Sequence, residues 1–213
     1  MPGCAALTRY RYNNSPLDMD GHRIYIKDGD TVWNPGWQPT KTPLDSYSCR
    51  HGLGYTVVEG KKDGVTARQE LFVPKGDACE LDRVTVCNES AAVKELDLFS
   101  YVEFCLWDAM DDSSNFQRNY STGEVEVEGS VIYHKTEYRE RRNHYAVFWA
   151  NCPVDSFDTT RDAFCGVYGG PADPQAVRAG HCSGSIAHGW APVGALHIHL
   201  SLAPGESRSI LFG

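Results

Sequence analysis

The stretch from Ala195 to Leu202, with the sequence ALHIHLSL, decides the fold class. Apolar and polar side chains alternate along it, which is the pattern of a β-strand with one buried face. The stretches Arg23–Lys27 (RIYIK) and Gly123–Glu128 (GEVEVE) alternate in the same way. Because period two dominates the chain, the sequence predicts an all-β protein.

Further strands follow on both sides of these three stretches. They are predicted at Tyr55–Glu59, Val65–Val73, Leu81–Asn88, Val131–Glu137, Tyr145–Ala150, Ala163–Tyr168 and Ser207–Phe212. Asp63-Gly64 lies between two of them, and Asp-Gly supplies the positive φ of a hairpin turn. Many short strands at this spacing predict a large antiparallel β-sandwich, with no long helix.

The segment from Leu96 to Met110 fits two patterns. Its apolar residues suit a strand, but some of them would also line one face of a helix. Its Phe, Tyr and Val content favours a long strand. From Tyr168 to Gly194, recurring Gly and Pro predict loops.

Composition excludes several classes of function. The chain has 213 residues and a net charge of −8, which argues against a nucleic-acid binder. No apolar run approaches the ~18 residues of a membrane span, and Met1–Leu7 lacks the pattern of a signal peptide. We therefore expect a cytoplasmic protein. The eight cysteines contain no C-x₂-C pair, so no zinc ribbon is predicted and we expect reduced thiols.

Four aromatic residues, Trp33, Trp37, Tyr47 and Tyr55, cluster early in the chain. Their rings would suit a platform on which the C–H faces of a sugar stack. The favoured alternative is that they plug one end of the sandwich, since aromatic side chains dominate core burial.

Two charged patterns have both a functional and a structural interpretation. His197 and His199 share a strand face and would supply two ligands of a cupin-like metal site. The favoured interpretation is two solvent-facing histidines, so no metal site is predicted. Glu124, Glu126 and Glu128 also share a face, where we expect solvation or a basic neighbouring strand after the turn at residues 129–130.

The most polar loop, Asp108–Asn119, follows the longest apolar strand and contains Gln117 and Arg118. Loops on a rigid sandwich often carry binding groups, and Gln and Arg suit sugar hydroxyls or phosphate. Composition alone does not separate a binding loop from a solvated one.

Six strings in one order resemble the cellobiose phosphorylase family of inverting glycoside phosphorylases, which also includes chitobiose and cellodextrin phosphorylases. They are Leu7–Asn14, His51–Tyr55, Phe99–Trp107, Asn115–Asn119, Ile132–Arg142 and Pro204–Arg208. The resemblance runs from Leu7 to Phe212. It implies that residues 7–213 form a galactose-mutarotase-like supersandwich, truncated at its N-terminal edge, whereas residues 1–6 match nothing. The catalytic (α/α)₆ domain of the family is absent.

The family reaction is the reversible phosphorolysis of a β-glucosidic bond, with cellobiose as the substrate that the resemblance favours. It yields α-glucose 1-phosphate and glucose, and needs inorganic phosphate as co-substrate but no cofactor. The groups that catalyse it lie in the absent domain, so no catalytic residue is assigned and the chain is expected to be inactive alone.

The resemblance also implies a homodimer, in which a Gln-Arg pair of one sandwich reaches toward the sugar site of its neighbour. Gln117 and Arg118 match that pair, which makes them the predicted substrate-binding residues. The alternative is a stand-alone carbohydrate-binding β-sandwich. Since strands and a domain are missing, we also expect the fragment to self-associate or to be marginally stable.

Overall fold

The computed structural model describes residues 7–8, 21–104, 122–138, 141–189 and 192–213. The strands are β1 (Arg23–Asp28), β2 (Thr31–Trp33), β3 (Ser46–His51), β4 (Tyr55–Lys62), β5 (Val65–Phe72), β6 (Leu81–Asn88), β7 (Lys94–Glu103), β8 (Thr122–Glu128), β9 (Val131–Tyr138), β10 (Arg141–Trp149), β11 (Ser156–Thr160), β12 (Pro192–Leu202) and β13 (Ser207–Phe212). The helices among these residues are α2 (Arg161–Cys165) and α3 (Gln175–Ala179). Neither helix is long and apolar enough to cross a membrane.

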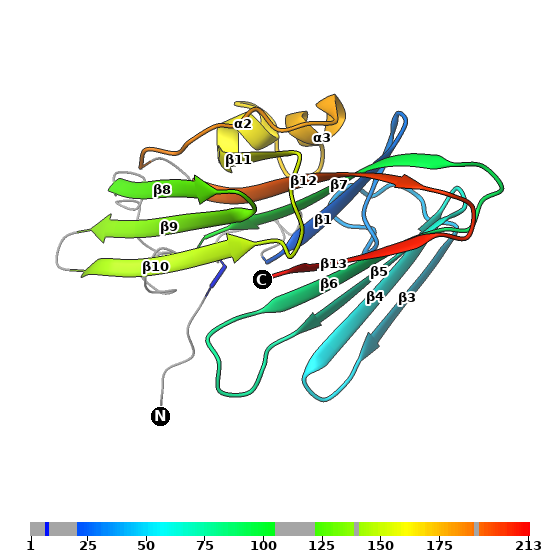
Figure 1. Cartoon of the computed structure of the whole chain (residues 1–213), viewed down its shortest axis with the longest axis horizontal. Coiled ribbons are helices and arrows are strands. Elements are labelled where there is room, and N and C mark those ends of the chain that lie inside the picture. Colours follow the sequence, from blue (N-terminus) through cyan, green and yellow to red (C-terminus); the bar gives the residue numbers. More distant parts are fainter. Residues whose placement is uncertain (1–6, 9–20, 105–121, 139–140, 190–191) are drawn as a thin grey trace.

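The strands form antiparallel sheets in two layers (Figure 1). One layer has the order β11-β12-β7-β1-β2. The other consists of β13-β6-β5-β4-β3 and of β10-β9-β8, which meet through a bridge between Ala150 and Phe212. Two backbone hydrogen bonds of 3.0 Å between Trp149 and Gly213 strengthen that junction. The second layer is therefore longer than the first.

The middle strands of the shorter layer are buried on both faces. In β1, Ile24 and Ile26 belong to the core between the layers, whereas Tyr25 belongs to a second apolar cluster. Phe164 of α2 and Val177 of α3 complete this second cluster. The two helices lie over the outer face of the sheet in Figure 1, so they exclude water from a face that simple alternation would leave exposed.

The predicted all-β antiparallel sandwich is confirmed. The β4–β5 hairpin turns at Asp63 and Gly64, with φ values of 49° and 79°. The described part of the ambiguous segment, up to Phe104, contains the strand β7, as its composition predicts, whereas residues 105–110 lie outside the described residues. The predicted turn at residues 129–130 joins β8 and β9.

The predicted strand at Ala163–Tyr168 is wrong. Its first residues belong to α2, whose N-terminus is capped by the Thr160 hydroxyl accepting the Ala163 N–H at 3.4 Å. Phe164 and Cys165 are adjacent and both buried. A strand that is buried on both faces also has adjacent buried residues, so the sequence resembles such a strand. The predicted loop region from Tyr168 to Gly194 also contains α3 and the start of β12.

Candidate functional site

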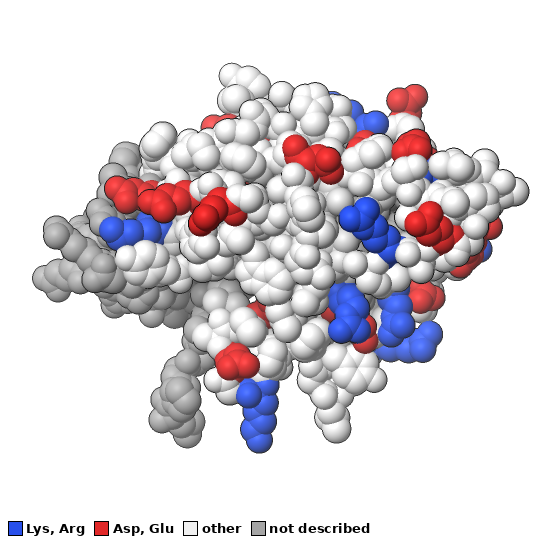
Figure 2. Space-filling model, viewed as in Figure 1, with Lys and Arg blue, Asp and Glu red and all other residues white. Residues whose placement is uncertain are grey.

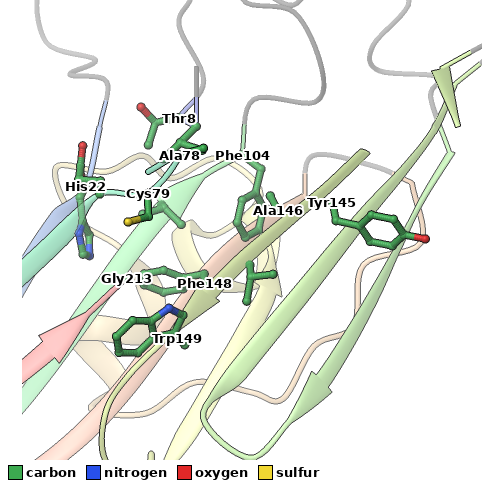
Figure 3. A pocket seen from close by; sticks show the side chains of 14 residues that line it. Thr8, His22, Ala78, Cys79, Phe104, Tyr145, Ala146, Phe148, Trp149 and Gly213 are labelled. Carbon is green, nitrogen blue, oxygen red and sulfur yellow. The ribbon is translucent and has the colours of Figure 1, made fainter. Parts of the chain in front are cut away.

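A pocket of about 270 Å³ lies where the two parts of the longer layer meet the end of β7. Phe148 and Trp149 of β10 and Phe104 after β7 contribute rings to its lining, and the segment 78–80 before β6 contributes the opposite side (Figure 3). The full lining among the described residues is Leu7, Thr8, His22, Ala78, Cys79, Glu80, Val102, Phe104, Tyr145, Ala146, Val147, Phe148, Trp149 and Gly213. The pocket is thus built by segments that are distant in sequence.

Two glycines fix these rings from behind. A Cβ on Gly194 of β12 would lie 2.6 Å from Cδ1 of Phe148 and 3.1 Å from Cζ of Phe104. A Cβ on Gly213 would lie 2.4 Å from Cζ2 of Trp149. The distances of 2.6 and 2.4 Å are shorter than real Cβ contacts and that of 3.1 Å is unusually short, so the rings pack directly on glycine backbone.

The polar groups that the described residues place in the pocket are few, and they include an acid but no Lys or Arg. Burial raises the pKa of the Glu80 carboxyl, which has no ion-pair partner among the described residues. Thr8 contributes a hydroxyl and Cys79 a thiol. The pocket therefore suits a neutral, hydroxyl-bearing ligand better than an anion.

A Ser–His–Asp arrangement lies beside the pocket. His22 hydrogen-bonds to the Ser100 hydroxyl through Nε2, and its Nδ1 lies 3.0 Å from Oδ2 of Asp82. Gln69 donates to the same Asp82 oxygen at 2.7 Å. Burial lowers the pKa of His22 to about 3 and raises that of Asp82 to about 7, so the pair shares a single proton.

The three side chains are connected as in a nucleophilic triad, but a substrate cannot reach the serine. Ser100 is fully buried in the middle of β7 and does not line the pocket. A substrate carbonyl would have no route to its hydroxyl, so geometry argues against acyl transfer. His22 also packs edge-on against Phe148, with ring centroids 5.5 Å apart. The network is a buried polar connection between the two layers, which is a structural role, and Oδ1 of Asp82 has no hydrogen-bond partner among the described residues.

The prediction that His197 and His199 both face solvent is wrong for His197. It is only 4% exposed, because α2 and α3 cover this face of the sheet, and it stacks on Phe99 at 4.5 Å. Its two ring nitrogens lie 2.9 Å from the Ser156 hydroxyl and 3.0 Å from Asp97.

His199 is exposed and lies beside two carboxylates, 2.9 Å from Asp97 and 3.0 Å from Glu95. The hydrogen bond to Asp97 has the largest effect on the pKa of His199, and together with the one to Glu95 it raises that pKa. Within the described ranges no group of three or more His, Cys, Asp or Glu side chains is placed to hold a metal ion. Hydrogen bonds to Asp97 and Glu95 thus explain where the two histidine side chains lie.

The four early aromatic residues do not form one platform. Trp33 is fully buried in the core, which agrees with the prediction that these aromatic rings fill one end of the sandwich. Trp37, Tyr47 and Tyr55 are each about half exposed, but Tyr47 is paired with Gly60 whereas Tyr55 lies at the other end of β4. A sugar platform that includes Trp33 is therefore excluded.

The acidic strand β8 is solvated as expected. Glu124 and Glu128 are exposed, and Glu124 lies opposite Lys135 of β9. Figure 2 shows acidic side chains gathered over β8, and both signs of charge spread over the rest of this face.

The predicted substrate-binding residues Gln117 and Arg118 lie outside the described residues. The pocket and the His22 network are features that the sequence analysis missed. Their residues are scattered along the chain, and no local motif links His22, Asp82 and Ser100. Only the strand order that places β7 and β6 in facing layers brings them together.

Comparison with known proteins identifies the family. The family model for the glycosyl hydrolase 94 supersandwich domain matches residues 3–213. An N,N'-diacetylchitobiose phosphorylase from Vibrio proteolyticus is 36% identical over 208 residues, covering 94% of this chain and 26% of the relative. A solabiose phosphorylase from Paenibacillus borealis is 37% identical over 197 residues, covering 90% of this chain and 25% of the relative.

Among solved structures, a putative kojibiose phosphorylase from the human microbiome is similar, with 12% identity and a TM-score of 0.48. It is matched over 89% of this chain and 21% of its own. The chain thus spans about a quarter of the length of the curated relatives that it matches. Because the family model matches almost every residue, the chain belongs to the supersandwich domain family of glycosyl hydrolase family 94.

Proposed function

We propose that this chain is the N-terminal supersandwich domain of a phosphorylase that cleaves a β-linked disaccharide with inorganic phosphate. The observation that carries the proposal is the family match over residues 3–213 together with relatives that are themselves named disaccharide phosphorylases. The whole enzyme would be a cytoplasmic glycosyltransferase that releases a sugar 1-phosphate and a free sugar. Phosphate is its co-substrate, and no cofactor is needed.

The chemistry explains why the chain alone is expected to be inactive. In inverting phosphorolysis one carboxylic acid protonates the departing glycosidic oxygen while phosphate attacks the anomeric carbon from the opposite face. Phosphate is already an anionic nucleophile, so no second carboxylate is required. Among the described residues, the lining of the pocket contains a carboxyl but no Lys or Arg. We assign the catalytic groups to the part of the whole enzyme that lies beyond the quarter of the relatives' length that this chain spans.

Cellobiose is the proposed substrate, with other β-linked disaccharides as the alternatives. The relatives are named for diacetylchitobiose, for solabiose and, at 29% identity, for 3-O-β-D-glucopyranosyl-β-D-glucuronide. The reverse reaction of the complete reading frame distinguishes these substrates. We expect α-glucose 1-phosphate to be consumed with glucose as acceptor. Consumption only of N-acetylglucosamine 1-phosphate with N-acetylglucosamine as acceptor, or only of α-glucose 1-phosphate with glucuronate, would replace cellobiose by the corresponding disaccharide.

We further propose that the whole enzyme is a homodimer in which Gln117 and Arg118 contribute to the sugar site of the partner subunit. The amide and the guanidinium together offer donors and an acceptor for sugar hydroxyls. Replacing both residues by Ala in the complete enzyme should raise the KM for the disaccharide about tenfold or more, since a lost hydrogen bond to the charged Arg118 guanidinium contributes about 1.5–3 kcal/mol and one to the neutral Gln117 amide about 0.5–1.5 kcal/mol.

The matched control is Asn143→Ala in β10, a polar residue of the same sandwich. Steady-state kinetics and sedimentation of both variants test the assignment. If the Gln117→Ala/Arg118→Ala enzyme keeps its KM, kcat and dimerisation, these residues do not close the partner's site.

A further inference from the structure

We propose that the pocket between β10 and the segment 78–80 binds a single neutral pyranose. This site lies on the supersandwich itself, and residues of this chain line it. It does not depend on the proposed function, because binding by the 213-residue chain is measured without any catalysis.

The size of the pocket fits one sugar ring. Its volume of about 270 Å³ is just below the range of about 300–1,000 Å³ that is typical of pockets for drug-sized ligands. A disaccharide would extend beyond it, whereas a single hexose would fill it. The ligand class is therefore a monosaccharide or the terminal ring of a longer sugar.

The walls provide the apolar part of sugar recognition. Phe104 and Phe148 are almost completely buried, and Trp149 is half-buried beside them. In Figure 3 these rings lie on the side of the pocket opposite Cys79, while the Tyr145 ring is directed away. The C–H face of a pyranose stacks on such rings, and bulky planar side chains lose little entropy on binding. Because Gly194 and Gly213 hold the rings from behind, the wall is formed before the ligand arrives.

The polar groups select a neutral polyol. The Glu80 carboxylate accepts hydrogen bonds from hydroxyl groups, and Thr8 both donates and accepts. Among the described residues no Lys or Arg lines the pocket, so Glu80 disfavours a phosphorylated sugar relative to a neutral one. Burial raises the pKa of Glu80, and a hydroxyl donor from the ligand would stabilise its ionised form.

The test is direct binding of D-glucose to the 213-residue chain, measured by saturation-transfer NMR and calorimetry. We expect saturable binding with one site per chain, and no binding of inorganic phosphate. Choline is the competing probe, because a carboxylate beside aromatic rings also attracts a quaternary ammonium ion. Absence of saturable glucose binding, or binding of choline but not glucose, would overturn the proposal.

Two variants locate the site, each with a matched control. Glu80→Gln should weaken glucose binding about tenfold, since it removes a charge-assisted acceptor, while Glu128→Gln on exposed β8 should leave binding unchanged. Ala78→Trp places a bulky ring at the exposed rim and should abolish binding, whereas Ala91→Trp, on the exposed turn before β7, should not. Both Ala positions are exposed, so folding is preserved. Equal binding by Glu80→Gln and Ala78→Trp would place the sugar elsewhere.

Discussion

The side chains of His22 and His134 are both buried, but only His22 lies beside a carboxylate. His22 shares one proton with Asp82, whereas His134 stacks on Phe104 at 5.1 Å and its Nε2 has no hydrogen-bond partner among the described residues. Between about pH 4 and 6.5 the unfolded His22–Asp82 pair also carries one proton, on the histidine. Folding therefore changes the number of protons bound at His134 but not at the pair.

This difference predicts the acid sensitivity of the fold. Burial lowers the pKa of His134 to about 4, so below its unfolded pKa of about 6.5 the unfolded state binds one more proton. The free energy of unfolding should fall by about 1.4 kcal/mol per pH unit from this residue as the pH drops toward 4. His134→Phe should remove that slope.

Urea unfolding between pH 7 and 4.5 measures the slope, with exposed His181→Gln as control. The control should keep the slope of the original chain. An unchanged slope in His134→Phe would show that this side chain is not buried in its neutral form.

A second prediction at the scale of a single residue concerns Gly194. Its Cα packs so closely on Phe148 and Phe104 that Gly194→Ala must displace both rings. Such overpacking costs about 1–3 kcal/mol of stability. Gly170→Ala is the matched control, since its Cβ would meet nothing within 4 Å. Equal unfolding midpoints for the two variants would mean that the pocket wall is not close-packed.

Among the elements, the central strands were the most predictable. Their alternating residues enter two different apolar clusters, so β1, β7 and β12 have strong patterns and were identified from sequence. The exposed strand β3 has no apolar face, and β2 and β11 have three and five residues, which is why all three were missed. The five-residue helix α2 is too short to display a period of 3.6.

The strand β3 is at the edge of its sheet and exposes Tyr47 and Cys49. An exposed edge offers unpaired backbone groups to a second copy, which supports the expectation that the isolated chain self-associates. The double variant Tyr47→Lys/Cys49→Lys should shift the chain toward monomer in sedimentation velocity, because edge lysines repel a like strand. Val167→Lys/Tyr168→Lys, at two exposed positions in the loop after α2, serves as the control for the same added charge. A monodisperse monomer before any substitution would contradict the expectation.

At the scale of the whole molecule, sequence patterns predicted the layers but not the site between them. Antiparallel β-sandwich architecture follows from local alternation and turns, and it is what the structure shows. The pocket requires β10, the end of β7 and the segment 78–80 to meet, and such contacts depend on sheet order rather than on any local pattern. The helices over the outer face of the sheet, which bury His197, could not be anticipated for the same reason.

The central claim is that this supersandwich serves a disaccharide phosphorylase, although the chain covers about a quarter of its relatives. The most direct measurement is ³¹P NMR of the protein from the complete reading frame that contains these residues, incubated with cellobiose and inorganic phosphate. We predict phosphate-dependent formation of α-glucose 1-phosphate, and none with the 213-residue chain alone. Cleavage that proceeds equally without phosphate, or no sugar 1-phosphate from cellobiose or the relatives' named disaccharides, would contradict the claim.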